Sequence, residues 1–196
     1  MSRYLSISIR MMIVTAVLLG ILYPLAMTGL AQVLFPHQAN GSLVKQNGRV
    51  IGSSLIAQAF TSAKYFQPRP SAAGNGYNAM DSSPSNLGPT SKALIQQVRA
   101  AVRRQLAQDP GLRLGKIPVD MVTTSGSGLD PDITVANARA QAPRVASARS
   151  MALQRVLALI AQHTTGRQFG FLGEPRVNVL ELNLALDAVQ GAVARR

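Results

Sequence analysis

The feature that most constrains this chain is residues 11–35, a long run that holds no charged side chain. A helix needs about 20 mainly apolar residues to cross the hydrocarbon core of a bilayer. A buried helix of a soluble protein would show a polar face, whereas this run has few polar side chains, among them Thr15, Thr28 and Gln32. We therefore predict a transmembrane helix over residues 11–35.

A cleaved signal peptide is the alternative reading of this run. Arg3 and Arg10 would form its basic region, and residues 29–31 (Gly-Leu-Ala) resemble a small-x-small cleavage site. The apolar part of a signal peptide covers only about 7–15 residues, however, so the length favours an uncleaved anchor. Pro24 then marks a kink, a packing site for another transmembrane helix, or a harmless proline facing lipid.

The charges beside the span predict its orientation. Residues 1–10 carry Arg3 and Arg10 and no acidic residue, and short basic arms stay in the cytoplasm. Residues 36–196 are then expected in the periplasm, outside the inner membrane of a bacterium. The predicted organisation is a cytoplasmic arm (1–10), a single transmembrane helix (11–35) and one extracytoplasmic domain (36–196).

The composition of residues 36–196 limits the functions of this outer domain. Its length suits one globular domain with its own core, and the absence of cysteine excludes disulfides and thiolate metal sites. His37 and His163 lie far apart, so no metal site is predicted. The domain has a net charge of about +10, because it holds all 8 acidic residues and all but two of the 20 basic ones. Aromatic residues do not interleave with the basic ones, which argues against nucleic acid and favours anionic lipid or an acidic partner.

Local patterns predict a mixed α+β domain. Asn47-Gly48 between two short apolar segments is a strong hairpin signal. Residues 61–89, rich in Ser, Pro, Gly and Asn, indicate a long irregular loop, in which Tyr65, Phe66 and Tyr77 argue for some packing. The remaining predicted elements are a helix over 89–108 capped by Thr90 or Ser91, a strand over 117–123, a short helix over 135–141 broken by Pro143, a helix over 147–163, a strand over 176–181 and a closing helix from Leu182.

Residues 124–132 form a loop with small residues, two glycines and two acids. No Gly-Lys-Ser/Thr follows, so the loop is not a Walker motif, and it lacks the dinucleotide fingerprint. Asp130 and Asp132 lack the EF-hand pattern, and Ser125 and Ser127 lack an evident histidine partner. The residues alone favour a structural turn.

Several segments, in order, resemble one family: the C subunit of the Kdp-type potassium-transporting P-type ATPase. The strongest matches are VDMVTTSGSGLDP at 119–131 and GEPRVNVLELN at 173–183. The others are GSSLI at 52–56, Tyr65-Phe66, RPSA at 69–72, YNA at 77–79, SNLGP at 85–89, Gln141, RVA at 144–146 and Ala148-Arg149. The chain departs from the family pattern at Ser83-Pro84, at Ser91-Lys92 and at Asp132, where histidine is frequent.

The resemblance implies an accessory subunit without catalytic residues, metal or intrinsic cofactor. Its partners would be a potassium-channel-like subunit, a P-type ATPase subunit and a small peptide subunit, and this complex would handle ATP and K⁺. Family C subunits are needed for assembly and are described as catalytic chaperones that raise the ATP affinity of the P-type subunit. The implied nucleotide-related residues are Ser125, Gly126, Ser127, Gly128 and Gln141. The implied partner-contact or structural residues are Arg69, Pro70, Ser71, Asn86, Asp120, Asp130, Arg144, Arg176 and Asn178.

The predicted topology conflicts with direct nucleotide binding, because a periplasmic domain cannot touch cytoplasmic ATP. We therefore expect an indirect effect on ATP affinity, with the outer domain capping the ion-conducting subunit at its extracellular mouth. Two alternatives remain: a membrane-tethered basic module that binds lipid or polyanion, and a tethered hydrolase, for which no nucleophile with a base is evident.

Overall fold

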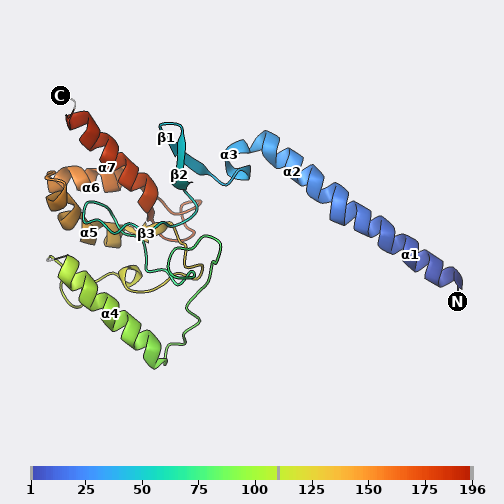
Figure 1. Ribbon diagram of the computed structural model, residues 1–196, viewed down its shortest axis with the longest axis horizontal. Helices are drawn as coiled ribbons and strands as arrows, with labels where there is room; N and C mark the ends of the chain where they lie inside the picture. The colour runs from blue at the N-terminus through green and yellow to red at the C-terminus, as the bar shows by residue number, and fades with distance from the viewer. Residues whose placement is uncertain (1, 110, 195–196) are drawn as a thin grey trace. The chain divides into compact units, whose positions relative to one another are not determined.

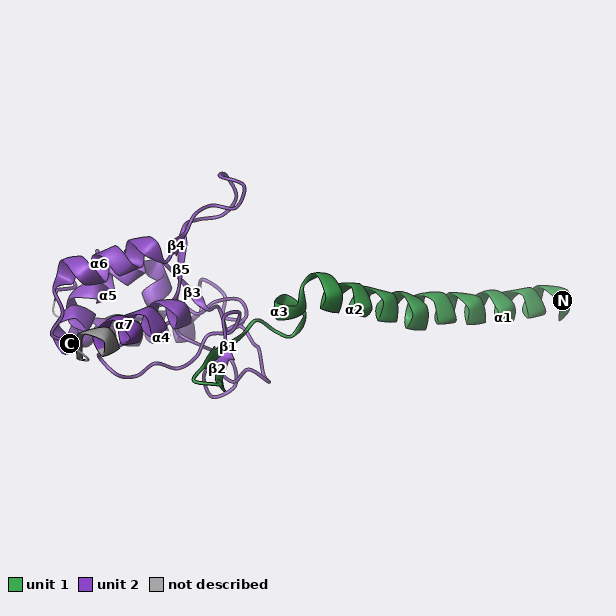
Figure 2. Cartoon of the chain, turned by 90° about the horizontal axis from the view of Figure 1, so that it is seen from above, with its two compact units in different colours: residues 1–51 green, residues 52–196 purple. Residues whose placement is uncertain are grey.

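The computed structural model describes residues 2–109 and 111–194 and divides the chain into two compact units, residues 1–51 and 52–196. Figure 1 shows the elements in order, and Figure 2 colours the two units. The predicted class is confirmed, because a long apolar N-terminal helix precedes a domain that mixes helices and strands.

The first unit is dominated by a continuous helix over Ser2–Leu34, made of α1 (Ser2–Val17), a π turn η1 (Leu18–Leu22) and α2 (Tyr23–Leu34). It spans 33 residues and contains an 18-residue stretch with a mean hydropathy of 2.2, so it is long and apolar enough to cross a membrane. The π turn lies just before Pro24, whose ring would otherwise clash with a carbonyl of the preceding turn. There the Tyr23 N–H reaches back five residues to the Leu18 carbonyl.

A short helix, α3 (Pro36–Ala39), and a hairpin of β1 (Leu43–Gln46) and β2 (Arg49–Ser53) follow the long helix. Asn47 and Gly48 form the turn with φ of 51° and 78°. Both angles lie in the left-handed region that type I′ turns require, so the predicted hairpin is confirmed.

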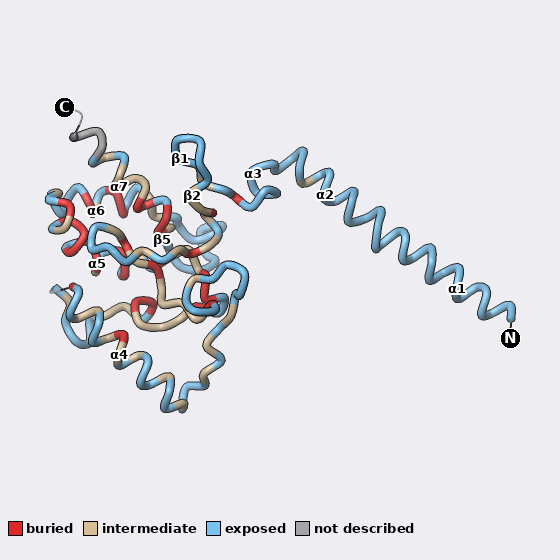
Figure 3. Tube along the Cα trace, in the orientation of Figure 1, coloured by how far each residue is buried: buried red, intermediate tan, exposed pale blue. Residues whose placement is uncertain are grey.

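The second unit has its core where three helices meet a small antiparallel sheet. The helices are α5 (Val135–Ala148), α6 (Leu153–Gln162) and α7 (Val179–Ala194). The sheet has the order β3 (Asp132–Thr134), β5 (Arg176–Asn178), β4 (Thr164–Thr165), with Ile133 opposite Val177. Buried residues gather along these helices, whereas α4 (Lys92–Gln108) is mostly exposed (Figure 3).

Two sequence predictions are wrong about residues 117–163. Residues 117–123 form a 3-10 turn, η2 (Val119–Met121), instead of a strand, because the Asp120 side chain is bound to the start of α5. Helix α5 does not break at Pro143 but runs to Ala148, and α6 begins only at Leu153. Pro143 lies on the exposed face, so it removes one backbone hydrogen bond while the buried face of the helix is kept. The chain turns instead at Ser150, where φ is 52°.

The predicted strand over 176–181 ends three residues early. Asn178 ends β5, and its side-chain oxygen accepts a hydrogen bond from the Glu181 N–H at 3.1 Å, so α7 already begins at Val179. Strands β3 and β4 were not predicted, because at three and two residues they are too short to show a period. Residues 61–89 contain no helix or strand, as predicted.

Candidate functional site

Residues 63–67, the clamped segment, cross the second unit without regular structure, yet side chains hold each of their five carbonyl groups. The Arg144 guanidinium donates to the carbonyls of Ala63 (2.8 Å) and Tyr65 (3.1 Å). The carbonyls of the other three residues accept from Arg149 (Lys64, 2.6 Å), Asn183 (Phe66, 3.0 Å) and Gln141 (Gln67, 3.0 Å). The helices α5 and α7, with Arg149 just after α5, thus supply the partners that a neighbouring strand would supply in a sheet.

Two amide side chains act as bidentate clamps on this segment. Asn183 accepts from the Phe66 N–H at 2.8 Å and donates to the Phe66 carbonyl, and Gln141 makes the same pair of bonds with Gln67. Phe66 is fully buried between them in the hydrophobic core. Both amides are buried too, so the clamps form where water cannot compete with them.

Gln141 has no hydrogen-bonding capacity left for a ligand. Besides the two bonds to Gln67, its Nε2 donates to Asn137 Oδ1 at 2.7 Å, and its Oε1 accepts from Arg144 Nη2 at 2.7 Å. Two donors and two lone pairs are all that a glutamine side chain offers. Its geometry therefore corresponds to a structural clamp.

Asp120 anchors the beginning of α5. Its carboxylate accepts from the Thr134 N–H (2.8 Å), the Thr134 hydroxyl (3.1 Å) and Asn137 Nδ2 (3.0 Å). A negative charge at a helix N-terminus is favoured by the helix dipole and the free N–H groups there. Asp120, Asn137, Gln141 and Arg144 thus form one hydrogen-bonded chain along α5.

Arg144 ends this chain in a buried ion pair. Its Nε lies 2.7 Å from Asp109 Oδ1, and both side chains are almost completely buried. The other carboxylate oxygen, Oδ2, accepts no hydrogen bond within the described part of the chain. Burial raises the pKa of the Asp109 carboxyl above its usual value, although the Arg144 charge opposes that rise.

Arg149 forms a second cluster with Tyr65 and Asp187. Its guanidinium lies 4.7 Å from the centre of the Tyr65 ring and pairs with Asp187 Oδ1 at 2.8 Å. The Tyr65 hydroxyl donates to the other oxygen of Asp187 at 3.1 Å. Burial and the neighbouring Asp187 carboxylate raise the pKa of Tyr65, so its hydroxyl remains a donor at neutral pH.

The loop of Ser125, Gly126, Ser127 and Gly128 is a compact turn packed on residues 71–83. The hydroxyls of Ser125 and Ser127 accept from the N–H groups of Asp130 (3.4 Å) and Leu129 (3.1 Å) in the same loop. The Ser127 carbonyl accepts from the Ser83 N–H at 3.1 Å. Gly128 has φ +69°, and a β-carbon there would lie 2.6 Å from the Ser83 carbonyl oxygen. Only glycine fits this approach, so these contacts hold the two loops together.

Arg69 joins this loop to the clamped segment. Its guanidinium donates to the Thr124 carbonyl at 3.1 Å and pairs with Asp130 at 3.2 Å. The Tyr77 hydroxyl donates to the Arg69 carbonyl at 2.8 Å, and burial raises the pKa of that hydroxyl. Residues 67–69 therefore connect Gln141 to the Ser-Gly-Ser-Gly loop.

Helix α4 is the most basic element of the second unit. It carries Lys92, Arg99, Arg103 and Arg104, all exposed, and no acidic residue. A groove of about 930 Å³ lies between α4 and residues 70–72, 84, 85, 87 and 122–124. Arg103 and Arg104 reach the lining of this groove, so it could accept an acidic group.

Comparison with known protein families decides which kind of chain this is. The family model described as "KdpC: K+-transporting ATPase, c chain" matches residues 5–188. This chain belongs to the KdpC family. Among curated relatives named potassium-transporting ATPase KdpC subunit, that of Rhodospirillum rubrum is 61% identical over 170 residues, which cover 87% of this chain and 88% of the relative. That of Acidobacterium capsulatum is 59% identical over 185 residues, which cover 94% and 98%.

In this KdpC-family chain, most residues singled out from the sequence make hydrogen bonds or ion pairs within the domain. Ser71 Oγ accepts from the N–H groups of Ala73 and Tyr77, and Arg176 pairs with Asp132 at 2.8 Å. Asn178 donates to the Ser54 carbonyl at 2.8 Å. Asn86, with φ 52°, is exposed in the loop, and Pro70 lies in the lining of the α4 groove. A role of any of them in nucleotide or partner binding stays a prediction.

Sequence reasoning missed four residues of these networks: Asp109, Asn137, Arg149 and Asn183. Arg149 and Asn183 carried a signal, because both lie in segments that match the family, whereas no sequence pattern pointed to Asp109 or Asn137. In the described parts of the chain, no three His, Cys, Asp or Glu side chains cluster as metal ligands would.

Proposed function

We propose that this chain is a non-catalytic accessory subunit that stabilises an ATP-driven potassium-uptake complex. Its membership of the KdpC family, over residues 5–188, carries this proposal, because relatives that it matches over most of their length are named subunits of a potassium-transporting ATPase. A subunit of this kind needs a membrane anchor and a surface for its partners. The helix Ser2–Leu34 fits the first requirement by length and composition.

The proposed partners are a potassium-channel-like subunit, a P-type ATPase subunit and a small peptide subunit. The proposed location is the bacterial inner membrane, with the N-terminus in the cytoplasm and the second unit in the periplasm. Arg3 and Arg10 at the start of the long helix favour this orientation. Potassium and ATP are then handled by the partners, and this chain has no intrinsic cofactor.

We further infer that any effect on ATP affinity acts through assembly. Gln141 uses all four of its hydrogen-bonding positions inside the domain, and the hydroxyls of Ser125 and Ser127 cap their own turn. A subunit that binds the assembled, nucleotide-competent state more tightly than the free partners raises ATP affinity by linkage, without contact. Such tighter binding could come from the second unit capping the channel-like subunit at its extracellular mouth, far from the nucleotide.

The first test is recovery of the complex from potassium-starved cells. The tagged chain is purified in mild detergent, and the co-purifying proteins are identified by mass. We expect a large polytopic subunit and a P-type ATPase in fixed ratio. Recovery of the chain alone, from membranes that contain those subunits, would contradict the proposal.

A second test separates direct from indirect action on nucleotide. Gln141→Ala is unsuitable alone, because it also breaks the clamp on Gln67. Gly126→Ala instead changes the Ser-Gly-Ser-Gly loop, at a position with open space around the added β-carbon. We expect the full chain in detergent to show no micromolar ATP binding by calorimetry. Micromolar binding that Gly126→Ala weakens would show direct contact.

The alternative function, a tethered basic module for lipid or polyanion, has one observation in its favour: the exposed basic side chains of α4. Such binding falls steeply with salt and needs no partner subunit. Reversing the charge of Arg99 and Arg103 would then abolish binding to anionic vesicles while complex recovery is kept.

A further inference from the structure

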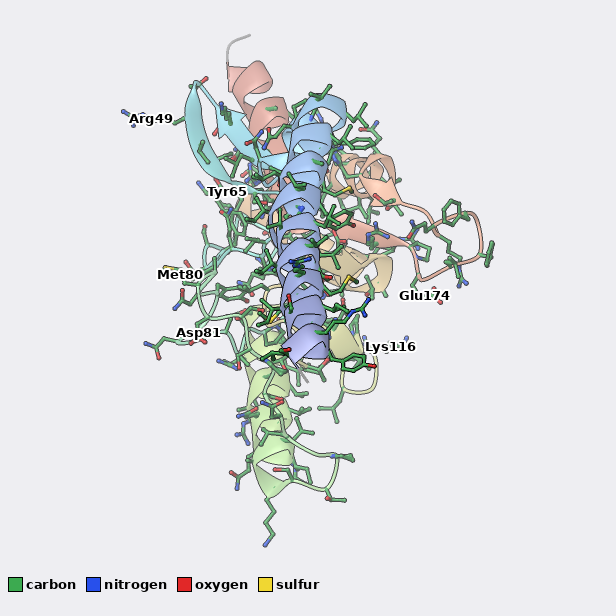
Figure 4. All side chains as sticks on the ribbon, turned by 90° about the vertical axis from the view of Figure 1, so that its right-hand side faces the viewer. Arg49, Tyr65, Met80, Asp81, Lys116 and Glu174 are labelled. Carbon is green, nitrogen blue, oxygen red and sulfur yellow. The ribbon has the colours of Figure 1, made fainter. Side chains whose placement is uncertain are left out.

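The hairpin between β4 and β5 presents apolar side chains at its end. Phe169 and Phe171 are 79% and 71% exposed, and Leu172 is 48% exposed. We call these three residues the aromatic tip. The hairpin extends from the body of the second unit (Figure 2), and the labelled Glu174 lies on it in Figure 4. Phe66, by contrast, is fully buried in the core of the same unit.

The aromatic tip has a defined backbone shape. Gln168 and Leu172 exchange two backbone hydrogen bonds of 2.9 Å, and the Gly170 N–H donates to the Arg167 carbonyl at 3.1 Å. Phe169 has φ 53°, a conformation that is unfavourable for a bulky side chain. A glycine there would relieve this strain, so the structure holds an aromatic ring outward at a conformational cost.

The charges of the hairpin are already paired. Arg167 binds both carboxylate oxygens of Glu174 at 2.8 Å and 2.9 Å, and Arg176 pairs with Asp132 at 2.8 Å. Within residues 164–176, no other basic or acidic residue is present. Loops that bind anionic membranes combine apolar side chains with free basic ones, and this hairpin offers no free cation for a lipid phosphate.

We propose that the aromatic tip inserts into an uncharged apolar socket on another protein subunit of the transporter. The proposal rests on the proposed function and adds to it the surface used and the chemistry of the partner. Exposed aromatic side chains on a preorganised backbone are typical of the residues that dominate protein interfaces. A neutral, aromatic surface matches a desolvated socket, where an unpaired charge would oppose binding.

The chain has no cysteine, so a single thiol can report on the tip. Phe171→Cys in the full chain is labelled with an environment-sensitive fluorophore, then reconstituted alone in vesicles or assembled with the other subunits. Met80→Cys is the matched control, because Met80 is 96% exposed and lies on the opposite side of the second unit in Figure 4. Quenching by iodide reports exposure to water, and quenching by brominated lipid reports contact with acyl chains.

We expect the label at 171 to shift to the blue and lose most of its iodide quenching only on assembly, with no brominated-lipid quenching. The label at 80 should not change. The double variant Phe169→Ser, Phe171→Ser should weaken assembly at least about tenfold, as loss of interface anchors does. If the chain labelled at position 171 fails to assemble while the chain labelled at position 80 assembles, the tip lies at the interface and the proposal is supported.

Two results would overturn the proposal. One is brominated-lipid quenching of the label at 171 in vesicles of the chain alone, which would assign the tip to the membrane. The other is full assembly with the 171 label still open to iodide. Failure of both labelled chains and of the unlabelled chain to assemble would instead contradict the proposed function, so the two ideas fail in different ways.

Discussion

At the scale of single residues, Gly128 and Asp109 show how close packing and burial constrain this domain. Gly128 lets the Ser-Gly-Ser-Gly loop approach residues 71–83, and a β-carbon there would also lie 2.8 Å from the Ala73 nitrogen. Asp109 keeps a carboxylate in the interior because Arg144 lies beside it. Each position therefore tolerates little change.

Gly128→Ala is expected to destabilise the second unit by at least about 2 kcal/mol, because the left-handed backbone and the clash with Ser83 add together. Gly126→Ala is the matched control, and it should change the free energy of unfolding by only about 0.5 kcal/mol, since its β-carbon meets nothing within 4 Å. Urea unfolding of the full chain in detergent measures both. Equal effects would show that the two loops are not packed in this way.

Acidic pH should stabilise the domain through Asp109. Its folded-state pKa is raised above the usual 3.8 by burial, so the folded protein binds this proton more tightly than the unfolded chain. The contribution of Asp109 to the unfolding free energy therefore falls as pH rises from 3.8 through the raised pKa. Burial raises the pKa of Asp132 as well, against the charge of Arg176, and this adds to the same slope.

Unfolding of Asp109→Asn across this pH range tests the assignment. The variant should lose the contribution of Asp109 to the pH dependence of the unfolding free energy. An unchanged slope in Asp109→Asn would contradict the raised pKa.

At the scale of elements, α5 organises the second unit although a proline lies within it. The helix carries Asn137, Gln141 and Arg144, which together bind η2, the clamped segment and Asp109. Pro143 lies on the exposed face between two of these residues, so the helix loses one backbone bond but no buried contact. The buried side chains of α5 therefore outweigh the local preference of proline to end a helix.

Pro143→Ala should stabilise the protein by roughly 1–3 kcal/mol, because it restores a helical N–H and removes the ring clash. Ser147→Ala, one turn later on the exposed face, should change stability by only about 0.5 kcal/mol. Thermal unfolding followed by circular dichroism compares the two. If Pro143→Ala lowered the unfolding temperature, the proline ring would be making a stabilising contact within the domain, which would contradict the prediction.

At the scale of the whole molecule, the chain combines a long apolar helix with a domain that has a core of its own. The buried residues of the main core cluster run from Phe66 to Leu186, within the second unit. This unit should therefore fold without the helix. The helix would then serve to hold the domain at the membrane, where its partners are.

Replacing residues 1–35 by a cleavable export signal should leave the folded core intact but lower recovery with the partner subunits at least about tenfold, because the tether raises effective concentration. Hydrogen exchange measures the core, and co-purification measures assembly. An unrelated apolar helix in place of residues 11–35 is the control, and it should restore recovery if tethering alone matters. Loss of protection in the α5–α7 core would contradict independent folding.

Features that depend on neighbouring residues or on ordered motifs were predictable from the sequence. The apolar run indicated the long helix, Asn47-Gly48 indicated the hairpin because two residues suffice for that turn, and the ordered segments indicated the family. The roles of the buried polar residues became visible only in the folded domain, because their partners lie far away in the sequence. The clamp between Phe66 and Asn183 joins positions 117 residues apart, and no local pattern encodes such a pair. Pro143 and Asp120 were misread for the same reason: burial and distant hydrogen bonds overrode the local preference of each segment.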